Sequence, residues 1–285
     1  VADIVGRPES KVLVVASEVR GIDYVATLRA IDAAAVPALR HLILIADGAE
    51  TIWPHVGAVT FASLTDAAPL DDDCAGPDTL SNIFTTSGTT AAPKFAAHAH
   101  AGVVGHALDV VDVLEMRAPG TVSLQLLPFC GVFGFVQVIA ALAAGVKMVM
   151  PSGFDAREAA HLAIEHKATH LLATDDMIHR MIGPGCEEAR SDTPFPHLKA
   201  CAFALFNTYL TDLPARAEAH GIPMLAPFGM SEVFSVFAIR RHHQPMIDRH
   251  RAGGTLVNPR ARVRARNPET GEILPDFEAG ELELY

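Results

Sequence analysis

The chain has 285 residues, of which 50% are hydrophobic and 19% are charged. This length and composition exclude a small disulfide-stapled scaffold, a disordered chain and a coiled coil, and they indicate a globular protein of one large domain or two ordinary ones. Acidic residues outnumber Lys and Arg by 33 to 22, for a formal net charge of -11, which disfavours nucleic acid as a partner.

The four cysteines show neither C-x-x-C spacing nor zinc-finger spacing to histidine. We therefore expect neither a disulfide framework nor a zinc knuckle, and a reducing cytoplasm is favoured. The longest apolar stretch, residues 132–146, is interrupted by Gln137 and Gly145, so it predicts a buried helix running into a strand and no membrane span. No signal-peptide pattern opens the chain, and its first residue, Val1, suggests a piece of a longer protein.

The first part of the chain alternates strand-like and helix-like patterns. Strands are predicted over residues 11–16 and 41–46, with a helix over 24–34 between them. This βαβ rhythm indicates a mainly parallel sheet. The turn-forming, aspartate-rich stretch 69–77 then predicts a boundary between subdomains.

The middle of the chain repeats the alternation, with helices between successive strands. Asp155 with Glu158 and Thr174 with its following aspartates are helix-start signals, and Thr211 is expected to open a helix that Gly221 closes. The predicted strands cover residues 80–86, 121–127, 146–150, 169–173 and 199–203.

The end of the chain is predicted to be rich in β-structure. Arginines at positions 260, 262, 264 and 266 alternate with apolar residues, which places them on one face of a strand. A solvated strand face is favoured over a polyanion site because the surrounding chain is acidic. Residues 267–271 form a predicted turn into a second strand ending at Tyr285.

The fold class expected is thus α/β, with mainly parallel sheets flanked by helices and a β-rich end. The predicted parts are an incomplete first α/β subdomain over 1–78, a second α/β subdomain over 79–239 that carries the site, and a β-rich segment over 240–285.

The most informative stretch is a hydroxyl-rich loop that follows a predicted strand and precedes a helical pattern. Its hydroxyls, one glycine and one lysine offer many hydrogen-bond donors to a phosphate chain. A Walker A loop is excluded because it would need glycine at Pro93 and a hydroxyl at Phe95. Composition alone is more typical of an ordinary surface loop. The stretch reads Ile83-Phe84-Thr85-Thr86-Ser87-Gly88-Thr89-Thr90-Ala91-Ala92-Pro93-Lys94.

The order of these residues resembles the phosphate-loop signature of the AMP-forming adenylating enzymes, the superfamily of acyl-CoA synthetases, luciferases and peptide-synthetase adenylation domains. Ala91 stands where the family usually has glycine, which would stiffen the loop. The stretch from His98 to His100, expected as a helix behind the loop, is similar to the family's Thr-His pair. The resemblance implies nucleotide-binding roles for Thr86, Ser87, Gly88, Thr89, Thr90 and Lys94.

A second segment, residues 127–134, is similar to the family motif that borders the carboxylic-acid tunnel. Gly131 stands where an aromatic side chain or histidine is common, so the resemblance implies a wider pocket that suits an aromatic or medium-chain acid. Helical spacing in this segment is equally typical of core packing. The implied pocket residues are Phe129, Cys130, Gly131, Phe133 and Gly134, together with Val233.

A third segment, residues 227–232, looks like the family's Tyr-Gly-x-Thr-Glu motif. By this resemblance Phe228 stacks on adenine beside Gly229, Ser231 donates to the α-phosphate, and Glu232 ligates magnesium. A turn with a helix cap is the competing interpretation of this string. The preceding segment 203–207 occupies the place of the family's stretch under the adenine, which implies that Ala204 and Leu205 also bind nucleotide.

The last resemblance lies in residues 267–272 and 280–283, which are similar to the β-rich end of the family's large domain. The family's ribose-binding aspartate and its mobile C-terminal lid domain with a catalytic lysine would come after Tyr285, so the stretch alone is expected to be inactive. Lys94, Ser231 and Glu232 are the implied catalytic residues.

The resemblance implies a ligase that uses ATP, Mg²⁺ and coenzyme A to convert a carboxylic acid into an acyl-adenylate and then a thioester. The alternative is a non-catalytic nucleotide- or acyl-adenylate-binding module, which Ala91 and Pro227 favour. The acid itself, a carrier protein as acyl acceptor in place of coenzyme A, and a homodimer are left open.

One histidine group, His242, His243 and His250, could be taken for a metal site. No cysteine or carboxylate stands at a helical ligand spacing beside the first two, so we expect a polar loop with these histidines facing solvent.

Overall fold

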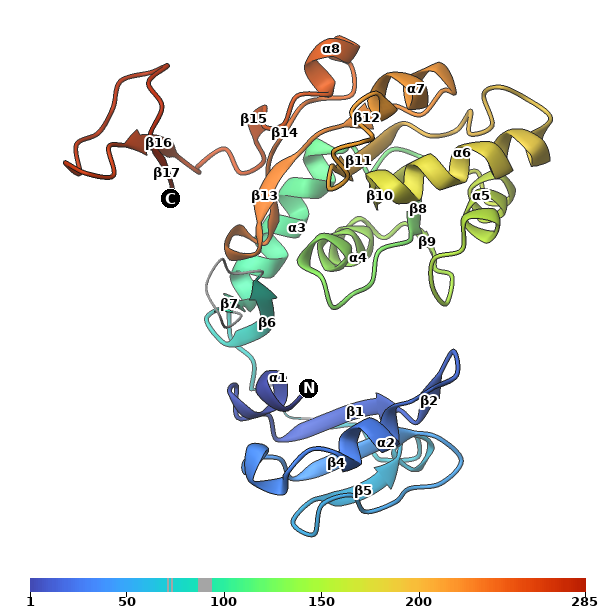
Figure 1. The fold of residues 1–285 in the computed structure, drawn as a ribbon, viewed down its shortest axis with the longest axis vertical. Helices are drawn as coiled ribbons and strands as arrows, with labels where there is room; N and C mark the ends of the chain where they lie inside the picture. Colours follow the sequence, from blue (N-terminus) through green and yellow to red (C-terminus); the bar gives the residue numbers. More distant parts are fainter. Residues whose placement is uncertain (71, 73, 87–93) are drawn as a thin grey trace. The chain divides into compact units, whose positions relative to one another are not determined.

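The computed structural model describes residues 1–70, 72, 74–86 and 94–285. It divides into two compact units, Val1–Ala75 and Gly76–Tyr285, each with its own core (Figure 1).

The first unit contains a parallel three-stranded sheet in the order β1-β4-β5. The helix predicted over 24–34 is shorter, because Asp23 caps α2 and Asp32 caps a separate 3₁₀ turn. The elements are α1 (Ala2–Gly6), β1 (Val12–Ala16), β2 (Glu18–Val19), β3 (Ile22–Asp23), α2 (Tyr24–Arg29), η1 (Ala33–Ala35), β4 (His41–Ile45), β5 (Gly57–Thr60) and η2 (Ala62–Leu64).

The second unit is built on a five-stranded, wholly parallel sheet in the order β12-β11-β10-β8-β9. The chain steps from β8 to β9 on one side and then crosses to β10 on the other, so the strand order reverses between β8 and β10. The strands are β8 (Val122–Gln125), β9 (Lys147–Val149), β10 (His170–Thr174), β11 (Ala200–Ala204) and β12 (Met224–Leu225).

Helices cover both faces of this sheet. Along β10, Leu171 and Ala173 belong to the core under α5, α6 and α7, whereas Leu172 belongs to the core under α3 and α4. This alternation is what a buried strand with two covered faces requires. In Figure 1, α5 and α6 lie side by side, as do α3 and α4. The helices are α3 (His100–Val113), α4 (Val132–Ala144), α5 (Ala156–Glu165), α6 (Asp175–Ala189) and α7 (Leu213–Ala219).

The predicted helix ends agree with the structure at three of four places. The side chains of Asp155 and Thr174 accept backbone N–H groups at the starts of α5 and α6, and Gly221, with φ 76°, follows the end of α7. The fourth place, the start of α7, differs by one residue, because the helix begins at Leu213 with Asp212 and not Thr211 at its N-cap. Pro214 sits in its first turn, where a missing N–H is tolerated.

The segment directly after the hydroxyl-rich loop, which was predicted to be helical, begins as a strand. β6 (Leu80–Thr86) pairs antiparallel with β7 (Lys94–Ala99), with Thr86 opposite Lys94, and α3 begins only at His100. Pairing with the seven-residue β6 satisfies the backbone groups of β7, and this tertiary partner overrides the helix-like local pattern.

The end of the chain is rich in β-structure, as predicted, and its strands pair antiparallel. Strands β13 (Phe228–Met230), β14 (Ser235–Ile239) and β15 (Thr255–Leu256) form one sheet, and β16 (Val263–Arg266) and β17 (Glu281–Leu284) form a hairpin. The short elements η3 (Ser231–Val233) and α8 (Met246–Arg249) complete the unit.

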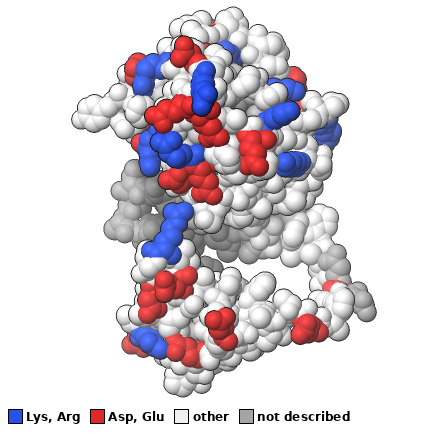
Figure 2. Space-filling model, turned by 90° about the vertical axis from the view of Figure 1, so that its right-hand side faces the viewer, with Lys and Arg blue, Asp and Glu red and all other residues white. Residues whose placement is uncertain are grey.

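Two of the alternating arginines pair with a carboxylate on the neighbouring strand. Arg264 and Arg266 both bind Glu283 across the β16–β17 hairpin, and these hydrogen bonds lower the pKa of Glu283 to about 2. On the face drawn in Figure 2, acidic and basic side chains are interspersed. Among the described helices, none has the length and apolar character that a bilayer crossing needs.

Two glycines at the start of α4 provide a test of its packing. A Cβ on Gly134 would lie 2.3 Å from the Pro128 carbonyl oxygen, whereas a Cβ on Gly131 would lie 3.8 Å from the same atom. We expect Gly134→Ala to lower the free energy of unfolding by about 1–3 kcal/mol and Gly131→Ala to lower it by less than about 1 kcal/mol. Urea unfolding of both variants measures the difference, and equal losses would contradict this packing.

Candidate functional site

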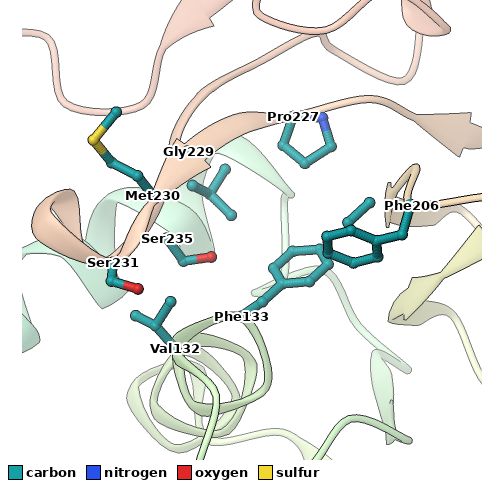
Figure 3. A pocket seen from close by; sticks show the side chains of 10 residues that line it. Val132, Phe133, Phe206, Pro227, Gly229, Met230, Ser231 and Ser235 are labelled. Atoms are coloured by element: carbon teal, nitrogen blue, oxygen red, sulfur yellow. The ribbon is translucent and has the colours of Figure 1, made fainter. Parts of the chain in front are cut away.

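A cavity of about 200 Å³ lies in the second unit where α4, β13 and the chain after β11 meet. Its lining mixes apolar side chains with two hydroxyls (Figure 3). The lining residues are Val132, Phe133, Ala204, Phe206, Pro227, Gly229, Met230, Ser231, Ser235 and Val236.

The cavity has two chemically different ends. In Figure 3 the hydroxyls of Ser231 and Ser235 are directed into it from one side, and the rings of Phe133 and Phe206 extend into it from the other. Such an arrangement fits a ligand with a polar, hydrogen-bonding group joined to an apolar or aromatic part.

The position of the cavity follows from the sheet. Ala204 is the last residue of β11, and Pro227 lies two residues after the end of β12, so the lining comes from the carboxyl edge of the parallel sheet. Ligands of open α/β sheets bind at this edge, close to the point where the strand order reverses.

A buried carboxylate holds the chain after β11 in place. Asp175, which is 1% exposed, accepts backbone N–H groups from Phe206 at 2.9 Å and from Asn207 at 2.6 Å. Its other oxygen accepts the N–H of Asp176 at 2.9 Å. Asp175 therefore fixes the backbone that presents Phe206 to the cavity.

Only glycine fits at position 229. A Cβ there would lie 1.5 Å from the carbonyl oxygen of Ser235 on the paired strand β14. This close approach is created by Phe234 and Ser235, which both have positive φ, at 55° and 83°, and turn the chain sharply from η3 into β14. Positive φ is costly for a bulky residue, so the surroundings must compensate for it.

The ring of Phe234 supplies that compensation. It lies between 5.1 and 6.1 Å, by ring centroids, from the rings of Phe84, His98, His106 and Phe135. Nε2 of His98, on β7, also donates to the carbonyl oxygen of Ser231 at 2.8 Å. The turn that carries Ser231 and Glu232 is thus tied to the β6–β7 hairpin.

A sequence model of the AMP-binding enzyme family matches residues 1–284. The chain belongs to the AMP-binding enzyme family. Two curated relatives are similar over shorter stretches. The long-chain-fatty-acid–CoA ligase FadD13 of Mycobacterium tuberculosis is 30% identical over 125 residues, which is 43% of this chain and 24% of that protein. The indoleacetate–CoA ligase of Aromatoleum aromaticum is 28% identical over 195 residues, 65% of this chain and 36% of that protein.

These matches span between 24% and 36% of the length of the two relatives. Among solved structures, the o-succinylbenzoate coenzyme A synthetase MenE of Bacillus subtilis, in complex with ATP and magnesium ion, has a TM-score of 0.70. The match covers 87% of this chain and 50% of that one at 17% identity. The likeness confirms the predicted α/β fold with parallel sheets and flanking helices.

Four residues that the family resemblance implied line the cavity of this AMP-binding family member, namely Phe133, Ala204, Gly229 and Ser231. Glu232 lies on η3 directly after Ser231 and is exposed, and Val233 is half-buried beside it. Gly134 is buried in α4 and does not line the cavity.

The other implied residues lie apart from this lining. Phe129 lines a second cavity of about 350 Å³ next to the ends of β8 and β9, while Cys130, Gly131 and Leu205 are exposed. The ring of Phe228 packs against Phe237 at 6.4 Å by ring centroids and does not line the cavity. Its role in adenine stacking stays a prediction.

The phosphate-loop residues are described only at the two ends of the loop. Thr86 ends β6 and Lys94 begins β7, so the hairpin places them opposite each other. Ser87, Gly88, Thr89, Thr90 and Ala91 lie outside the described residues.

Several residues of the site carried no recognisable sequence signal. Asp175 reads as a helix-start residue after Thr174, and Ser235 is separated from the motif by two residues. Phe206 belonged to the segment under the adenine but matches no family residue there. Only the fold brings these side chains together.

His106 provides a pH test of the ring cluster. Burial, aided by the nearby charge of His98, lowers the pKa of His106 from 6.5 to about 4, and its Nε2 has no hydrogen-bond partner among the described residues. The unfolded chain therefore binds a proton that the folded chain refuses, so His106 makes the unfolding free energy fall as the pH drops from about 7 towards 4, with no further fall below that.

We expect His106→Gln to flatten the pH profile of unfolding in this window. Urea midpoints between pH 4 and 7 measure it, with the exposed His197→Gln as the control that keeps the slope. An unchanged slope in His106→Gln would show that His106 binds its proton equally well in the folded and the unfolded chain.

Proposed function

We propose that this chain is the nucleotide- and acid-binding part of a ligase that activates a carboxylic acid with ATP to an acyl-adenylate and then forms a thioester with coenzyme A. The observation that carries the proposal is the two-ended cavity next to Ser231 and Glu232, connected through His98 to the hairpin that ends in Thr86 and begins again at Lys94. Membership in the AMP-binding enzyme family supports it.

In the first step, an oxygen of the carboxylate attacks the α-phosphorus of ATP, and the bond to the β-phosphate oxygen breaks to release pyrophosphate. In the second, the thiol of coenzyme A loses its proton and attacks the acyl carbonyl, and AMP leaves. No general base is needed in the first step because a carboxylic acid is already ionised near neutral pH.

The residues act by position and charge. The Ser231 hydroxyl, directed into the cavity, would donate to the α-phosphate, where negative charge builds up in the transition state. The Lys94 ammonium, at the start of β7, would neutralise the departing phosphates. Lys94 and His98 are both on β7, so the His98–Ser231 hydrogen bond links the turn that carries the Ser231 hydroxyl to the strand that carries Lys94.

The chain also offers a suitable ligand for magnesium. Glu232 is an exposed carboxylate next to Ser231, and carboxylate oxygen is the hard donor that Mg²⁺ takes together with substrate phosphates. When bound, the ion would neutralise phosphate charge.

The lining favours an apolar acid over an amino acid. Phe133, Val132 and Phe206 supply no carboxylate that could pair with a substrate ammonium group. The exposed Gly131 adds no side chain at the start of α4. The relatives named above act on a long-chain fatty acid and on indoleacetate, which is consistent with an aromatic or medium-chain acid here.

Acid-dependent exchange of labelled pyrophosphate into ATP tests the proposal. In the longer protein that contains this chain, we expect exchange with indoleacetate or octanoate, little with alanine, and a loss of about 100-fold or more in Ser231→Ala, whereas the 285-residue stretch alone should show little or none. Nucleotide binding without exchange for any acid would instead assign the chain to the alternative, a binding module without turnover. Exchange that Ser231→Ala leaves unchanged would contradict the site.

A further inference from the structure

A second polar cluster lies in the same unit, on the histidine pair that the sequence analysis assigned to solvent. One ligand atom each from Glu115, His242 and His243 lies within 4.8 Å of the others. Glu115 lies two residues after the end of α3, whereas the histidines follow β14. Only the fold therefore brings the carboxylate close to the histidines. His250 is not part of the cluster, because its Nε2 lies 3.4 Å from Glu218.

We propose that Glu115, His242 and His243 form a surface site for a divalent late transition-metal ion of the zinc class. Two imidazole nitrogens and one carboxylate oxygen are a donor set that Zn²⁺ accepts, with water in the remaining position. Mg²⁺ and Ca²⁺ prefer oxygen donors, so the site differs in chemistry from the one proposed at Glu232.

The backbone on the carboxylate side is held firmly. Glu115 has φ 55°, and its neighbours Leu114 and Met116 are buried. The N–H of Met116 donates to the Val111 carbonyl oxygen at 2.9 Å. The side chain of Glu115 is therefore projected outward from a fixed point at the end of α3.

The backbone on the histidine side is held against the same helix. Nη1 of Arg241 donates to the carbonyl oxygens of Val113 at 3.1 Å and Asp112 at 3.4 Å. The N–H of Arg241 donates to Oε1 of Gln244 at 2.8 Å, which closes the loop that contains both histidines. The two ligand-bearing segments are thus fastened to each other beside the cluster.

Only small side-chain movements separate the present geometry from a bound one. Nδ1 of His242 lies 3.9 Å from Oε1 of Glu115, and the two imidazole rings are 5.6 Å apart by centroids. Tetrahedral zinc with nitrogen and oxygen ligands places its ligand atoms about 3.3 Å apart. All three side chains are exposed, so rotation about their own bonds can supply the remaining ångström or so.

Calorimetric titration of Zn²⁺ into the 285-residue chain tests this site. We expect His243→Ala and Glu115→Gln each to weaken Zn²⁺ binding by about tenfold or more, since even indirect losses around a metal cost that much. The matched control is His161→Ala, which removes a histidine whose two nitrogens contact two different carboxylates, Glu188 and Glu165, and it should leave Zn²⁺ binding unchanged.

A second readout is independent of affinity. Cobalt(II) added in place of zinc should give a visible absorption band that His243→Ala abolishes and His161→Ala retains. No zinc binding by the unmodified chain, or binding that Glu115→Gln and His243→Ala leave unchanged, would overturn the proposal. The unfolding temperature of each metal-free variant confirms that the exposed substitutions leave the fold intact.

Discussion

Replacing Glu232 by glutamine is expected to abolish the gain in ATP affinity that Mg²⁺ provides, while AMP binding changes by less than about twofold. Glutamine keeps the size of the side chain and removes its charge. In the proposed site magnesium accompanies the triphosphate, whereas AMP depends on Ser231 and on the walls of the cavity. Calorimetric titration with ATP and AMP, each with and without Mg²⁺, measures the four affinities.

The matched control for this experiment is Glu269→Gln, another exposed carboxylate, in the turn after β16. It should leave all four affinities unchanged. If Glu232→Gln weakens ATP and AMP equally, the carboxylate supports the turn and does not bind the metal. Where acid-dependent pyrophosphate exchange is measurable, the same substitution should reduce it by about 100-fold or more.

Asp175→Ala is expected to lower the unfolding free energy by about 2–4 kcal/mol, because three backbone N–H groups lose a charged acceptor. It should also weaken AMP binding by at least about tenfold, since the chain at Phe206 is no longer held at the cavity. Asp175→Asn keeps one oxygen acceptor, so its unfolding free energy and its AMP affinity should lie between those of the unmodified chain and of Asp175→Ala.

The adjacent Asp176→Ala separates these effects from a general loss of charge on α6. Asp176 is exposed and pairs with Arg180 at 3.5 Å, so its removal should cost less than about 1 kcal/mol and leave AMP binding unchanged. Urea unfolding and calorimetry test both variants. A loss of stability in Asp175→Ala with unchanged AMP affinity would show that Phe206 does not form part of the binding surface.

The sequence was sufficient for the sheet and for the helices with strong start signals. β6 covers the residues predicted for it, and Asp155 and Thr174 cap their helices as expected, because these features depend on a few neighbouring residues. The helix predicted directly after the hydroxyl-rich loop was wrong, because this segment forms β7. Its strand conformation depends on pairing with β6 and not on its own composition.

In the candidate site, too, residues in short motifs could be predicted, whereas residues that act through long-range contacts could not. Phe133, Gly229 and Ser231 could be found because each belongs to a short motif, and the clash of any Cβ at position 229 with Ser235 gives one of them a physical reason. Asp175, His98 and Phe206 act through contacts over long sequence separations, 31 residues for Asp175 to Phe206 and 133 for His98 to Ser231. Glu115 joined the histidine pair for the same reason, since no spacing along the chain relates it to them.

A crystal structure of the chain with AMP would show whether the cavity next to Ser231 is the nucleotide site. We expect AMP in the cavity between Phe206 and Ser231, with the α-phosphate within hydrogen-bond distance of the Ser231 hydroxyl and Glu232 beside the phosphate. AMP bound elsewhere on the chain, with this cavity empty at saturating nucleotide, would contradict it.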